Sequence, residues 1–111
     1  MKKTTIQNQD NESVVINVDS EGYAEITNRT FSNGAEIFYL VAETDDDDIC
    51  IGIFEDRAEA EDALKNLEET NFVAGEGMTA VEYMKKIDEY YRPIYVALET
   101  KTALEYVNRQ F

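Results

Sequence analysis

The sequence predicts an α+β domain in which a mostly antiparallel sheet of four to five strands carries two to three helices on one face. Short runs of alternating or β-branched residues, separated by turn residues, fill the first half of the chain. Capping signals followed by apolar residues at helical spacing fill most of the second half. The 111 residues, 43% of them hydrophobic, are enough for one domain with a core.

Four strands are predicted in the first half, and we expect them to form one antiparallel meander. The first two should pair as a hairpin across the turn at residues 19–22. The polar residues 1–12 are expected to be flexible, so the domain should span residues 13–111. The predicted strands cover residues 13–18, 23–27, 36–42 and 49–54.

The first predicted helix covers residues 57–69. Asp56 stands at its N-cap, and Glu59 completes the spacing of a capping box. The apolar positions recur at helical spacing and should face the sheet: Ala60, Ala63, Leu64 and Leu67.

A second helix should begin after Thr79, which with Glu82 forms another capping box, and should run to about Tyr91. Its inner face is predicted to hold Val81, Met84, Ile87 and Tyr91.

Pro93 should end this helix, because the residue before a proline avoids the α region. Beyond it we expect a strand at 94–98 and a helix capped by Thr100 that ends near Arg109. A continuous helix starting at Pro93 is the alternative, because proline is also accepted at a helix start. The inward positions of the last helix should be Ala103, Leu104 and Val107.

The residue inventory argues against most catalytic and metal chemistry. The chain has no histidine, so the commonest general base is absent. The single cysteine, Cys50, lies in the apolar run 49–54 and is expected to be a buried thiol. The acidic run at 45–48 does not fit a calcium loop, because Cys50 stands where the loop needs glycine. We therefore expect no catalytic residues, no metal site and no cofactor.

The charge and the N-terminus indicate a cytoplasmic protein that binds neither nucleic acid nor membrane directly. The formal net charge is −14, which repels phosphate backbones and anionic lipid surfaces. The start Met-Lys-Lys is followed by polar residues rather than by the apolar segment of a signal peptide.

The negative charge is concentrated in one segment, residues 43–69. This segment holds twelve acidic and two basic residues, a net charge of −10. On the first helix, acidic residues follow three- and four-residue steps, with Asn66 filling the gap, and should form a ridge along one face. The ridge consists of Glu55, Glu59, Asp62 and Glu69, and the preceding turn holds Asp45, Asp46, Asp47 and Asp48.

In size, charge and this acidic concentration, the chain resembles a class of small acidic α+β proteins of phages and mobile elements. That class includes anti-CRISPR and anti-restriction DNA mimics and inhibitors of uracil-DNA glycosylase. The resemblance implies a non-enzymatic inhibitor that binds a basic nucleic-acid-handling protein. No diagnostic motif carries it, so no residue role is transferred from a particular family.

Other functions fit parts of the same sequence. Tyr83 and Tyr90 fall near one flank of the second helix and are candidate partner contacts, or else ordinary core-edge residues. A small-molecule site lined by these tyrosines is an alternative, as is an accessory or structural phage-type subunit acting through a sheet edge. The acidic segment is also consistent with a surface that only keeps the protein soluble. The oligomeric state is left open.

Overall fold

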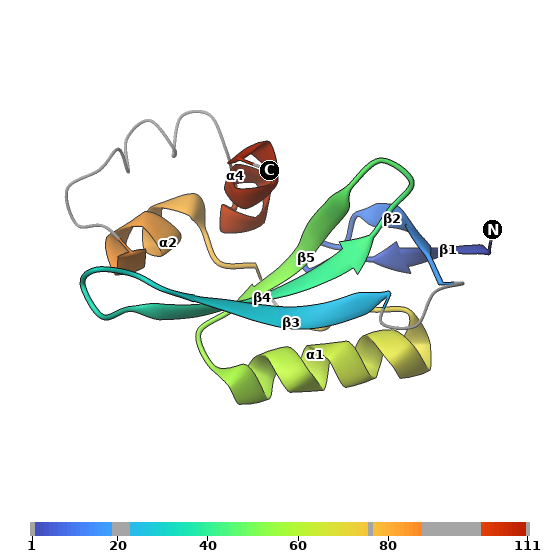
Figure 1. Ribbon diagram of the computed structural model, residues 1–111, viewed down its shortest axis with the longest axis horizontal. Coiled ribbons are helices and arrows are strands. Elements are labelled where there is room, and N and C mark those ends of the chain that lie inside the picture. The colour runs from blue at the N-terminus through green and yellow to red at the C-terminus, as the bar shows by residue number, and fades with distance from the viewer. Residues whose placement is uncertain (1, 19–22, 76, 88–100, 111) are drawn as a thin grey trace.

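The computed structural model describes residues 2–18, 23–75, 77–87 and 101–110 and confirms the α+β class (Figure 1). A two-stranded antiparallel sheet has the order β1-β2, and a three-stranded antiparallel sheet has the order β3-β4-β5. The strands are β1 (Lys3–Gln7), β2 (Ser13–Asn17), β3 (Ala24–Thr30), β4 (Glu36–Glu43) and β5 (Asp48–Phe54). The helices are α1 (Arg57–Thr70), α2 (Ala80–Ile87) and α4 (Ala103–Gln110).

The central strand β4 is apolar on both faces, and this decides how the layers stack. Ile37 and Tyr39 point to one face, and Phe38 and Leu40 point to the other. All four are buried, so neither face of the three-stranded sheet can be left to water.

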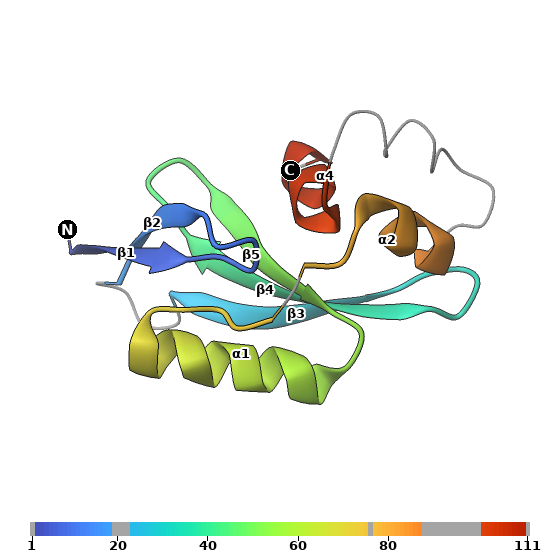
Figure 2. The same cartoon turned by 180° about the vertical axis from the view of Figure 1, so that it is seen from behind.

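Helices therefore cover both faces of the three-stranded sheet, and the predicted placement of all helices on one face is wrong. Figures 1 and 2 show α1 on one side and α2 with α4 on the other. The β1-β2 hairpin adds Ile6 and Ile16 to the α1 side of the core. Two apolar clusters result, one on each face of the sheet.

A β-bulge changes which residues of β5 reach each of the two clusters. Leu40 pairs with Gly52 and Val41 pairs with Cys50, which leaves Ile51 without a partner in the register. Because the extra residue shifts the alternation, Cys50 and Ile53 both face α2 and α4 although they are three residues apart. Ile51 lies on the α1 side of the sheet.

The N-terminal prediction is corrected. Residues 3–7 form β1, and β2 pairs with β1 rather than with β3, so the predicted four-strand meander contains only β3, β4 and β5. The backbone of Gln7 also bonds to the chain after α1, through Gln7 N–H to Asn71 O (3.0 Å) and Val73 N–H to Gln7 O (3.1 Å). These bonds and the burial of Ile6 order a segment whose polar composition suggested flexibility.

Helix α1 begins where it is predicted to begin and ends one residue later than predicted. Asp56 occupies its N-cap, but the side chain forms no capping hydrogen bond. The helix ends at Asn71 in the left-handed conformation (φ 60°), whose N–H bonds to Leu67 O. Of the predicted stripe, Ala60, Ala63 and Leu67 are buried and Leu64 packs at the edge of the core.

The capping box of α2 is confirmed. The Glu82 N–H donates to Thr79 Oγ1 at 3.1 Å, and the Thr79 N–H donates to Glu82 Oε2 at 3.4 Å. The inner face of α2 is rotated from the prediction, because Ala80, Tyr83 and Met84 are its buried residues while Val81 is only half-buried.

Helix α4 starts at Ala103, and its first turn is capped by Thr102 rather than by the predicted Thr100. The Glu105 N–H donates to Thr102 Oγ1 at 3.2 Å. The predicted inward residues Ala103, Leu104 and Val107 are all buried. The predicted strand at 94–98, its continuous-helix alternative and the end of the second helix near Tyr91 lie outside the described residues.

Candidate acidic binding groove

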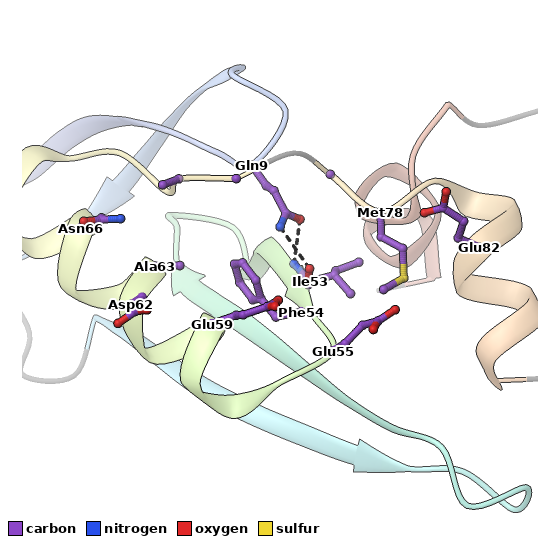
Figure 3. Close-up of a pocket in the computed structure, with 13 residues that line it drawn as sticks. Gln9, Ile53, Phe54, Glu55, Glu59, Asp62, Ala63, Asn66, Met78 and Glu82 are labelled. Carbon is purple, nitrogen blue, oxygen red and sulfur yellow. Dashed lines mark hydrogen bonds between the residues drawn. The ribbon is translucent and has the colours of Figure 1, made fainter.

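An open groove of about 480 Å³ lies between α1 and the segment that leads into α2 (Figure 3). Its apolar floor includes Ile53 and Phe54 from the end of β5, Ala63 from α1, and Met78 from the segment before α2. Four acidic residues also line it: Glu55, Glu59, Asp62 and Glu82. We call this hollow, defined by these eight residues, the acidic groove.

Helix α1 supplies one wall of the acidic groove. Glu59, Asp62 and Asn66 follow one another at steps of three and four residues, which places them on one flank of the helix. Glu55 extends the row just before the helix begins. Three of the four predicted ridge acids therefore line one groove, while Glu69 is exposed on α1 outside it.

Glu82 joins the groove from a different element, α2, and no sequence pattern predicts this. The only role that its spacing predicts is in the capping box of α2, which it also fulfils. Figure 3 shows Glu82 on α2, across the groove from Glu59 and Asp62 on α1. A residue brought in by tertiary packing leaves no periodic signal in the sequence.

The negative charge of the groove is only partly balanced. Lys86 Nζ lies 3.2 Å from Glu55 Oε2, and both side chains are substantially exposed. In the part of the chain that the structure describes, neither Glu59 nor Asp62 has an ion-pair partner. The two free carboxylates stand one helical turn apart beside an apolar floor, an arrangement that suits a cationic side chain with an apolar stem.

The Gln9 side chain closes the groove on the β5 side and holds the end of that strand. Its Nε2 donates to Ile53 O at 3.1 Å, and its Oε1 accepts from Ile53 N–H at 2.9 Å. The Gln9 backbone N–H donates to Ile51 O, the bulged residue, at 2.9 Å. Gln9 therefore replaces a neighbouring strand along this part of β5.

The four aspartates at 45–48 do not reach the acidic groove. They lie in the turn between β4 and β5 and at the start of β5, whereas Glu55 follows the other end of β5. Asp45 forms an ion pair with Lys3, and this hydrogen bond lowers the pKa of the Asp45 carboxyl. The predicted acidic residues thus form two separate clusters, Asp45 to Asp48 at the turn and the acids of the groove.

Tyr83 is a core residue, so its prediction as a partner contact is wrong. It is 4% exposed, and its hydroxyl lies 2.5 Å from that of Tyr39 on the central strand. Burial raises the pKa of both phenols, so both are neutral hydrogen-bonding groups at pH 7. The other candidate, Tyr90, lies outside the described residues.

The Cys50 thiol is fully buried, as predicted from its apolar neighbours. Burial raises the pKa of this thiol to about 12. Because the thiolate is the reactive form, we expect Cys50 in the native protein to resist an aromatic disulfide reagent at pH 8 and to react at once in denaturant. Absorbance of the released aromatic thiol measures this, and rapid labelling of the native protein would contradict the burial.

Among the described residues, no three acidic or cysteine side chains are grouped so that they could hold a metal ion, and no helix is long and apolar enough to cross a membrane. Comparison with family models, with curated proteins and with solved structures finds no match to this chain. The acidic groove is therefore the feature from which we infer a function.

Proposed function

We propose that the protein is a non-enzymatic, acidic interaction protein that inhibits a basic nucleic-acid-handling protein by occupying its nucleic-acid-binding surface. The observation that carries the proposal is the acidic groove, where Glu59 and Asp62 stand without ion-pair partners in the described part of the chain. Exposed carboxylates at helical spacing present a row of negative charge, as the phosphates of a DNA strand do.

The apolar floor of the groove supports a protein partner rather than free cations. Arginine and lysine have apolar stems below their charged heads, and such a side chain can place the stem on Phe54 and Met78. Its head then lies near Glu59 or Asp62. Basic clefts that bind nucleic acid are lined by these side chains, so the groove is complementary to them in both charge and chemistry.

A merely solubilising role is the competing explanation for the charge, and it makes a different prediction. Solubility depends on net charge and its spread over the surface, not on which acids are present. The proposed function depends on Glu59 and Asp62 in particular. Helix α1 offers a matched control in Glu61 and Glu68, which are exposed on the same helix but do not line the groove.

The test compares Glu59→Gln/Asp62→Asn with Glu61→Gln/Glu68→Gln as immobilised bait. Each variant carries a net charge of −12 instead of −14. From a bacterial lysate at low salt, we expect the wild type and the Glu61/Glu68 variant to retain the same basic nucleic-acid-binding protein. The Glu59/Asp62 variant should lose it, and moderate salt should release it from all baits. Identical capture by the three baits, or retention only of proteins that bind no nucleic acid, would refute the proposal.

A further inference from the structure

The two outer edges of the three-stranded sheet are treated differently by the fold. On β5, the Asn108 amide bonds to the backbone of Cys50: the Cys50 N–H donates to Asn108 Oδ1 at 3.0 Å, and Asn108 Nδ2 donates to Cys50 O at 2.8 Å. Gln9 forms hydrogen bonds with the backbone of Ile51 and Ile53 on the same strand. On β3, no strand within the described ranges pairs on the side away from β4. Because side chains bond to the backbone of the β5 edge and no strand covers the opposite edge, β3 is the edge available to a further strand.

The hydrogen-bond register fixes which backbone groups of β3 point outward. The bonds from Phe31 N–H to Ala35 O (2.8 Å) and from Glu43 N–H to Tyr23 O (2.9 Å) continue the β3-β4 register at both ends. Because such bonds alternate along an antiparallel pair, the odd-numbered residues of β3 bond to β4. The backbone groups of Ala24, Ile26, Asn28 and Thr30 therefore face outward.

We infer that this edge joins two copies of the chain, with β3 pairing antiparallel to β3 about a twofold axis at Thr27. In this register Ile26 of one copy exchanges backbone hydrogen bonds with Asn28 of the other. Glu25 of each copy then stands directly opposite Arg29 of the second copy, on the same face of the joined sheet. This arrangement is isologous and closes after two copies.

Charge complementarity favours β3 of a second copy as the partner strand, and it also favours the register in which the two strands pair. Glu25, Thr27 and Arg29 are exposed on one face of β3, and within the described residues neither charged side chain has an ion-pair partner. An axis at Glu25 or at Arg29 would set like charges against each other. An axis at Ile26 would place Glu25 opposite Thr27 and Arg29 opposite Tyr23. An axis at Asn28 would place Arg29 opposite Thr27 and Glu25 opposite Phe31. Only the axis at Thr27 pairs both opposite charges, and opposite charges across strands stabilise while like charges destabilise.

No residue of β3 lines the acidic groove, so the pairing of β3 strands and the proposed function rest on different residues. The inference is therefore independent of the proposed function, and either can fail without the other.

Sedimentation equilibrium of the whole chain up to about 1 mM tests the inference, since this range detects even weak pairing. We expect a concentration-dependent dimer of twice the 12.7 kDa chain mass. Arg29→Glu and Glu25→Arg should each weaken the dimer by about tenfold or more, because each places like charges opposite one another twice. The combined variant Glu25→Arg/Arg29→Glu restores opposite charges and should recover the dimer. Circular dichroism checks that each variant is folded.

A wild-type chain that stays monomeric over the whole range would overturn the inference, since the charged edge would then only prevent pairing. A dimer that is indifferent to both single substitutions, or not recovered by the combined one, would place the contact elsewhere and overturn it as well. The Glu59→Gln/Asp62→Asn variant serves as the control and should dimerise as the wild type does.

Discussion

Replacing Gln9 with leucine should lower the free energy of unfolding by about 2–6 kcal/mol, the largest loss that we expect from a change outside the apolar core. Leucine has nearly the shape of glutamine but no polar atoms. It would leave the N–H and the C=O of Ile53 without the bonds that Gln9 forms at 2.9 and 3.1 Å. An unsatisfied buried polar group costs roughly 1–3 kcal/mol, and two are created here.

Equilibrium unfolding in urea measures the effect of Gln9→Leu, and Gln7→Leu is the control. Within the described residues, the Gln7 side chain bonds only to Ser13 Oγ (3.0 Å) at the surface, so its loss should cost less than about 0.5 kcal/mol. Equal midpoints for the two variants would show that the Gln9 amide does not hold β5. A larger loss than predicted would indicate that the β1-β2 hairpin detaches together with the amide.

Periodicity predicted the elements whose sequence and packing agree. Strand β4 was predicted from its apolar run, and α1 and α2 from the spacing of a cap and a later glutamate. Alternation alone could not place the layers, because a short strand that is apolar throughout can be covered on either face or on both. The burial of Ile37 and Phe38 on opposite faces is what requires helices on both sides.

The sequence-based predictions fail for β1 and for Tyr83, where a few contacts between distant residues outweigh what the local amino-acid composition indicates. β1 is polar except for Ile6, yet that one buried side chain and the backbone bonds of Gln7 are enough to order it. Tyr83 was predicted as a possible contact because tyrosine is common at interfaces, but the hydroxyl of Tyr39 satisfies it in the core. Gln7 bonds to the chain after α1, and Tyr83 bonds to Tyr39 on β4. Both contacts join residues far apart in the sequence, so no local pattern could reveal them.

The acidic groove was predictable in part. Helical spacing alone placed Glu59 and Asp62 on one face of α1, and the structure adds a hollow beside them. The floor residue Phe54 comes from the end of β5, whereas Met78 and Glu82 come from the start of α2 and the segment before it. Their convergence depends on how the start of α2 and the segment before it pack near the end of β5, and such tertiary packing leaves no local sequence pattern.

The affinity of the captured partner for the protein, measured by titration across a range of salt and in competition with a DNA duplex, tests the proposed mimicry most directly. The wild type should bind more weakly as salt rises, because exposed charges are screened beyond about 8 Å at physiological ionic strength. DNA and the protein should exclude each other from the partner. Glu59→Gln/Asp62→Asn should lower the affinity by about tenfold or more, chiefly through slower association, and the Glu61→Gln/Glu68→Gln control should stay near the wild type. Simultaneous binding of DNA and protein, or equal losses in the two variants, would contradict mimicry through the acidic groove.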